Sequence, residues 1–110
     1  MTVKELVDAL NLTVVSGASG LNKEVAGGYV SDLLSDVMGN CDAGRIWITL
    51  QTHKNVMAIA SLKDLSAVIL VKDLKPEPDM ALQSEEEEIP VLSSSLQTFE
   101  LAGKIYDLLK

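Results

Sequence analysis

The sequence predicts an α/β fold: one compact domain, residues 1–110, with helices flanking a mainly parallel central sheet. Two apolar runs, residues 46–50 and 67–71, lack the polar alternation of a half-exposed strand and are expected to be covered on both faces. Segments with the three- and four-residue apolar spacing of helices separate the strand-like runs. Strands separated by helices are usually joined by right-handed crossovers in a parallel sheet.

The chain begins with a predicted helix over residues 3–10. Thr2 and Glu5 have the spacing of a capping box, and the apolar side chains that follow recur on one helical face. Residues 12–15 are rich in β-branched side chains and predict a strand, which the turn-forming residues 16–20 end.

Residues 25–30 predict a second strand, in which Gly27-Gly28 indicates a bulge or a close approach of backbone. A short amphipathic helix over residues 33–38 follows, and Gly39-Asn40 is expected to close it.

The second half alternates strands and helices more simply. The strand at residues 46–50 leads through a short connection to a helix at residues 55–62. After the strand at residues 67–71, Pro76-Glu77-Pro78 suits the start of a helix that runs to the acidic residues 85–88.

The last predicted strand covers residues 89–92, and a serine loop leads from it to a C-terminal helix. Ser94 and Gln97 have the spacing of a capping box for that helix. Its inner face is predicted to comprise Phe99, Ala102, Ile105, Tyr106 and Leu109.

Charge and cysteine content narrow the function classes. Nine Lys and Arg against sixteen Asp and Glu give a net charge of −7, which opposes binding to nucleic acid or to an anionic membrane surface. A single cysteine, Cys41, permits no internal disulfide, and the first ten residues lack the apolar core of a secretion signal. We therefore expect a cytoplasmic protein.

Polar loops follow three of the predicted parallel strands. Ligands of parallel α/β sheets bind where strands end and helix N-termini present free amides. Such a site suits a small anionic or nucleotide-like ligand, although the same side chains could simply cap helices. The candidate ligand-binding residues are Gln51, Thr52, His53, Lys54, Lys72, Asp73, Ser93, Ser94, Ser95 and Thr98.

Few residues of the sequence support a catalytic or metal-binding role. His53 could act as a base or pH sensor, but a solvated loop histidine is the simpler interpretation, and Cys41 is expected to be a buried or half-buried thiol. One Cys and one His cannot form a zinc site within one chain. The acidic stretch 85–88 is interpreted as a solvated helix end, and Trp47 as core or dimer surface.

The phosphate loop GxxxxGK[ST] is absent, and SGASG at residues 16–20 is a weak match to a glycine-rich phosphate turn. We therefore expect a protein that is not an enzyme, with no cofactor and no metal.

The chain resembles the DRTGG domain family over most of its length. The resemblance is carried by MTVKELVDALNLTVVSG, by GRIWITLQTHKNVMAIASLKDLSAVILVKDLKPEP and by EEEEIPVLSSSLQTFELAGKIYDLL. That family is similar to the N-terminal domain of HPr kinase/phosphorylase and occurs inside phosphotransacetylases and beside CBS domains. The resemblance implies a regulatory role without assigned catalytic residues, because the kinase activity resides in a separate domain.

The residues that name the family are replaced in this chain. Residues 50–54, LQTHK, stand where typical members have Gly-Asp-Arg, and residues 71–73, VKD, stand where they have Thr-Gly-Gly. The QTHK variant looks like the small stand-alone members found near iron-only hydrogenase genes, which implies a redox or energy-metabolism setting.

Two functions of different classes follow as expectations. The first is a non-catalytic module that senses a small anionic or nucleotide-like ligand or binds a protein partner. The second is a structural protein, a homodimer that docks on a larger redox complex; the mean hydropathy of +0.23 favours subunit contact. An enzyme acting through Cys41 or His53 is the least favoured alternative.

Overall fold

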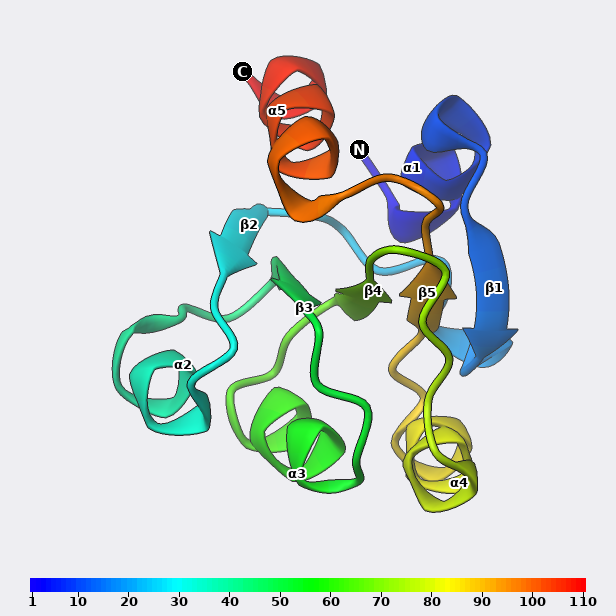
Figure 1. Cartoon of the computed structure of the whole chain (residues 1–110), viewed down its shortest axis with the longest axis vertical. Coiled ribbons are helices and arrows are strands. Elements are labelled where there is room, and N and C mark those ends of the chain that lie inside the picture. The colour runs from blue at the N-terminus through cyan, green and yellow to red at the C-terminus, as the bar shows by residue number, and fades with distance from the viewer.

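The computed structural model describes residues 1–110 and contains one five-stranded sheet (Figure 1). The strand order is β1-β5-β4-β3-β2; β1 runs antiparallel to β5, and all other neighbours are parallel. This confirms the mainly parallel α/β architecture. The strands are β1 (Thr13–Ser16), β2 (Gly27–Val30), β3 (Arg45–Thr49), β4 (Ala67–Leu70) and β5 (Val91–Ser93).

Five α-helices cover the two faces of the sheet. Helices α1 and α5 lie on one face, and α2, α3 and α4 lie on the other (Figure 1). A short 3₁₀ turn, η1 (Ala18–Gly20), follows β1. The helices are α1 (Val3–Leu10), α2 (Leu34–Asn40), α3 (Asn55–Leu62), α4 (Pro78–Glu87) and α5 (Thr98–Leu109).

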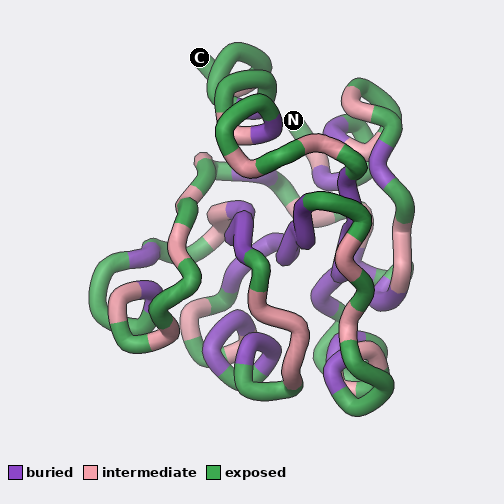
Figure 2. The backbone as a smooth tube through the Cα atoms, in the orientation of Figure 1, coloured by how far each residue is buried: buried purple, intermediate pink, exposed green.

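The central strands separate two hydrophobic clusters. Alternate side chains of β3 point to opposite faces, so Trp47 packs with the α2–α4 layer while Ile46 and Ile48 pack with α1 and α5. All of β4 is buried, as the unbroken apolar run predicts. Figure 2 shows the same distribution, with buried backbone concentrated in the central strands and on the inner sides of the helices.

The predicted capping box of α1 is confirmed. The Thr2 hydroxyl accepts from the Glu5 amide at 3.2 Å, and the Glu5 carboxylate accepts from the Thr2 amide at 2.8 Å. These hydrogen bonds from Thr2 hold the pKa of the Glu5 carboxyl below its ordinary value. The start of α4 also agrees with the prediction, because Pro78 occupies its first turn.

The glycine pair of β2 forms neither a bulge nor a close backbone contact, contrary to the sequence expectation. Gly27 and Gly28 pair in regular parallel register with Arg45 and Ile46, and a Cβ on Gly28 would approach no atom closer than 3.9 Å. The irregularity lies in β1, where the register with β5 shifts between Val14 and Ser16.

The inner face of α5 agrees with the prediction at Ala102, Ile105 and Leu109, which belong to or pack against the core, and differs at Phe99 and Tyr106. Leu101 and Ile105 are buried, whereas Phe99 and Tyr106 are 85% and 74% exposed. Phe99 precedes Leu101 by two residues and is therefore about 200° away around the helix. The sheet surface under α5 is shared with α1, so only one narrow stripe of α5 is covered.

The capping box predicted for α5 is absent as well. Gln97 is the N-cap but no side chain bonds the first turn, because the Ser94 hydroxyl accepts instead from the Leu96 amide at 3.1 Å. At α2, Gly39 and Asn40 lie within the helix rather than beyond it.

Candidate functional site

The loops that follow β3, β4 and β5 lie at one edge of the sheet and are tied together by backbone hydrogen bonds. After β4, the Lys72 amide donates to the Leu96 carbonyl at 2.9 Å, and the Asp73 amide donates to the Ser94 carbonyl at 2.8 Å. The Glu77 amide donates to the Thr52 carbonyl at 2.8 Å. The three segments therefore form one connected surface.

Asp32 organises this edge and was not among the residues singled out from the sequence. Its Oδ1 accepts from the Thr49 hydroxyl at 2.8 Å and from the Leu50 amide at 2.7 Å, and its carbonyl accepts from Gln51 Nε2 at 3.0 Å. The position of Asp32 could have indicated this role, because Asp32 follows β2, and β2 is parallel to β3, β4 and β5. Parallel strands bring all their carboxyl ends to one edge.

His53 is half-buried rather than fully solvated. Its Nε2 lies 3.0 Å from Gln51 Oε1, which can only accept, so Nε2 donates. Nδ1 of the neutral ring is then an acceptor; it is buried and has no hydrogen-bond partner. Gln51 thus links the imidazole to Asp32 and fixes its tautomer.

Two of the predicted serines hold the loops in place. The buried Ser93 hydroxyl donates to the Leu74 carbonyl at 3.1 Å, and the buried Ser94 hydroxyl caps the turn to Leu96. Ser95 is exposed and Thr98 is half-buried at the first position of α5. Thr52 is half-buried, with its hydroxyl 3.5 Å from a Glu77 carboxylate oxygen.

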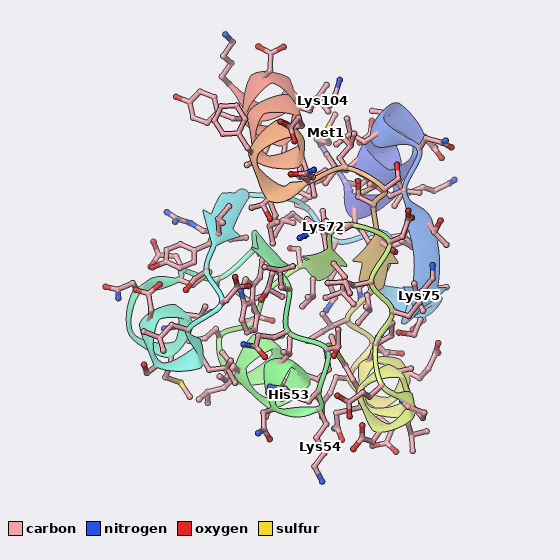
Figure 3. The ribbon with its side chains drawn as sticks, in the orientation of Figure 1. Met1, His53, Lys54, Lys72, Lys75 and Lys104 are labelled. Atoms are coloured by element: carbon pink, nitrogen blue, oxygen red, sulfur yellow. The ribbon has the colours of Figure 1, made fainter.

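Three exposed lysines border the same loops: Lys54, Lys72 and Lys75. None of them forms an ion pair, although the protein is acidic overall. Figure 3 shows Lys54 beside His53 at α3, and Lys72 and Lys75 along the chain that leads from β4 to α4. The cations are spread along the edge rather than gathered at one point.

The backbone adds to this surface. Lys72 and the exposed Asp73 both have left-handed conformations, with φ of 57° and 58°. The N-terminus of α3, at Lys54, is capped by no side chain. The sequence alternative that these polar residues merely cap helices therefore fails for α3, whose first-turn donors remain without a side-chain partner.

The other residues weighed for chemistry have structural roles. Cys41 is buried, as expected, and burial raises the pKa of its thiol. The SGASG segment packs under the chain before β5, and its Gly17 amide donates to the Glu85 carboxylate at 2.8 Å. Trp47 is fully buried in the core, and its Nε1 donates to the Ser31 carbonyl at 2.8 Å.

No group of three or more His, Cys, Asp and Glu side chains converges in a way that could hold a metal ion. None of the helices is both long enough and apolar enough to span a lipid bilayer.

Comparison with solved structures and with protein families places this fold. The chain is similar to the crystal structure of the CBS and DRTGG domains of the regulatory region of Clostridium perfringens pyrophosphatase, complexed with the activator diadenosine tetraphosphate. The TM-score is 0.71 at 14% sequence identity, over 94% of this chain and 45% of the other, so this chain spans less than half of that protein. Residues 5–108 match the DRTGG domain, and the chain therefore belongs to the DRTGG domain family, as the sequence resemblance indicated.

Proposed function

We propose that this protein is a non-catalytic regulatory module that binds a small anionic, nucleotide-like ligand at the carboxyl edge of its sheet. The observation that carries the proposal is the set of three lysines without ion-pair partners, Lys54, Lys72 and Lys75, along the loops at this edge. In a chain of net charge −7, cations without carboxylate partners mark a place where an external anion is favoured.

The shape of the site favours an extended ligand. The lysines are spread over the loops between α3 and the chain that leads to α4, which suits several linked phosphates better than a single small anion. The protein of similar fold comes from a regulatory region crystallised with diadenosine tetraphosphate, a dinucleotide of this kind. Lys54 and Lys72 would contact phosphates of such a ligand.

The first prediction concerns the affinity for this ligand class. In calorimetric titration, diadenosine tetraphosphate should bind more tightly than AMP, and inorganic phosphate should bind weakest. Lys54→Ala and Lys72→Ala should each weaken the binding of diadenosine tetraphosphate about tenfold, because each removes one charge-assisted hydrogen bond worth about 1.4 kcal/mol.

Lys104→Ala is the matched control. Lys104 is also exposed and unpaired but lies on α5 (Figure 3), so its loss should leave the affinity unchanged. An equal loss of affinity in all three variants would show that only net charge matters, and absence of binding across the nucleotide series would refute the proposal.

A second function, a structural protein that docks on a larger redox assembly, is favoured by exposed apolar side chains. Leu62 on α3 and Leu82 on α4 are 68% and 61% exposed, and these two helices are neighbours on one face of the sheet. Large exposed apolar residues mark protein contacts when they gather into patches. This function requires no response to nucleotides, so the titration above separates the two.

A further inference from the structure

An apolar groove of about 430 Å³ runs between α5 and the β2 edge of the sheet, away from the loops described above. Its floor includes Gly28, Val30 and Ile48, and Ile105 and Tyr106 of α5 form one wall. Gly28 adds to the space in this groove because it has no side chain; a Cβ there would meet only ordinary contacts, at 3.9 Å from the Ile46 carbonyl oxygen and 4.0 Å from Ile105 Cγ2.

Strand β2 leaves one side of its backbone unpaired, because β3 is its only neighbour in the sheet. The Ser31 amide donates to the Ile48 carbonyl, and in a parallel ladder every second residue bonds the same neighbour. Tyr29 therefore bonds to β3, while the amides and carbonyls of Gly28 and Val30 point away from it.

Natural proteins protect free edges with charges, prolines or bulges. Strand β1, at the opposite edge, has such a bulge, whereas the sequence Gly-Gly-Tyr-Val of β2 has none of these features. The β2 edge is thus unprotected beside an apolar groove.

Gly28 and Val30 lie on the same face of β2 and complement each other. Val30 is 49% exposed and projects beside the groove that Gly28 leaves open. Consider two β2 strands paired antiparallel about a two-fold axis that passes between their Tyr29 residues. Gly28 of one copy then lies opposite Val30 of the other, and the free backbone groups of these two residues face each other. Each Val30 side chain then enters the groove of the other copy.

The charges along this edge are complementary under the same two-fold axis. The only charged residues that line the groove are Arg45 and Lys110, both at the amino end of β2, where they pair only with nearby surface acids. Asp32 lies just beyond the carboxyl end of β2 and has no cation within 4 Å. Antiparallel pairing places Asp32 of the second copy opposite Ala26, which lines the cationic end of the groove.

We propose that two copies of this chain associate through antiparallel pairing of their β2 strands, with Gly28 opposite Val30, to form a continuous ten-stranded sheet. Closed two-fold dimers are the commonest assemblies of soluble proteins, and this edge is self-complementary in shape, hydrogen bonding and charge. The inference does not depend on the proposed ligand, because the groove and the free backbone of β2 lie outside the proposed ligand site, with which this edge shares only Asp32.

The test begins with the mass of the chain in solution, measured by sedimentation across a range of concentrations. The unchanged chain should sediment as a dimer. Val30→Lys should raise the dissociation constant at least about thirtyfold, because a lysine ammonium cannot enter an apolar groove without loss of hydration. Gly28→Ala should also raise the dissociation constant, because its methyl group occupies part of the groove, and a Cβ at this position meets only ordinary contacts within the chain.

Leu62→Lys is the matched control, since Leu62 is an exposed apolar residue on α3, and this variant should remain dimeric. Circular dichroism should show unchanged helix content in all three variants. A monomer in the unchanged chain, or equal dissociation with Leu62→Lys, would overturn the proposal.

Cysteine cross-linking tests the strand register. In a Cys41→Ala background, a mixture of Gly28→Cys and Val30→Cys chains should form a disulfide-linked dimer, because directly opposed residues are about 5.5 Å apart between Cα atoms. Neither chain alone should cross-link efficiently, since identical positions are then offset by two residues. Cross-linking of one chain alone in preference to the mixture would refute this register.

Discussion

Tyr29 and Asp36 are two titrating side chains joined by a hydrogen bond. The Tyr29 hydroxyl donates to Asp36 Oδ2 at 2.9 Å, and Asn40 Nδ2 donates to Oδ1 at 3.1 Å. The hydrogen bond from Tyr29 is the main reason that the pKa of the Asp36 carboxyl lies below its ordinary value. The same bond raises the pKa of the Tyr29 phenol.

This pair predicts a pH-dependent effect of Tyr29→Phe. A lowered carboxyl pKa stabilises the fold above the ordinary Asp pKa of about 4 and loses that effect as pH falls; a raised phenol pKa stabilises it below about pH 10. Tyr29→Phe should therefore reduce the free energy of unfolding between these limits, and the difference should shrink towards pH 3. Urea unfolding at several pH values measures this, and a difference that grows in acid would contradict it.

Individual site residues could be predicted only in part. Residue type and position after a strand were enough to place Gln51, Thr52 and His53 at one edge. The hydrogen bond from Gln51 to Asp32 depends on β2 lying next to β3, which residue spacing alone does not specify, and His53 reaches Asp32 only through Gln51. Likewise, Ser93 differs from Ser95 only in burial, which is set by the neighbouring loop.

Among the elements, the turn after β1 depends most strictly on glycine. Gly17 has a φ of 72°, and a Cβ there would lie 2.5 Å from the Ile89 carbonyl oxygen. A Cβ on Gly20 would collide with the Glu88 carbonyl. The turn therefore fits tightly beneath the chain that leads into β5, and its role is packing rather than phosphate binding.

Gly17→Ala should lower the free energy of unfolding by about 2 kcal/mol or more, since both the backbone conformation and the space oppose a methyl group. Gly39→Ala is the control, because Gly39 lies in α2 with no atom within 4 Å of its would-be Cβ. It should raise stability by about 0.5 kcal/mol. Chemical denaturation compares the two, and a neutral Gly17→Ala would show that the turn can shift.

The bounds of most elements could be predicted from the sequence, including the partly exposed helices α1 and α3, whereas the inner face of α5 could be predicted only in part. Strands β3 and β4 are apolar on both faces and were located to within one residue. For α5, several apolar side chains offered alternative inner faces, and the way the helix lies on β2 and β3 determines that Leu101, not Phe99, is covered.

At the scale of the whole molecule, negative charge predominates. Sixteen acidic residues face nine basic ones, and the four ion pairs lie largely exposed on the surface, where each contributes little. Repulsion among the remaining carboxylates opposes compactness.

The melting temperature should therefore rise by a few degrees between about 10 mM and about 150 mM NaCl, as the screening length falls from about 30 Å to about 8 Å. Calorimetry in NaCl and in KCl should give the same increase if screening is the cause. A melting temperature that falls with salt would show that the surface ion pairs outweigh the repulsion.

The overall topology was predictable as a class but not in full. Alternating strands and helices predicted the parallel sheet, whereas the antiparallel position of β1 beside β5 arises from packing between distant segments. The buried hydrogen bond from Ser16 to Ser84, at 2.9 Å and 68 residues apart, is one such contact.

The buried indole of Trp47 also makes this chain convenient to observe. It is the only tryptophan, it lies in the central strand layer, and its ring nitrogen is bonded to Ser31 at the end of β2. The intrinsic fluorescence of the unlabelled protein therefore comes mainly from one known position. Trp47 lies on β3, whose carboxyl end leads into the loops of the proposed ligand site and whose neighbour is β2. One optical signal can therefore follow unfolding, ligand binding and association in the same sample.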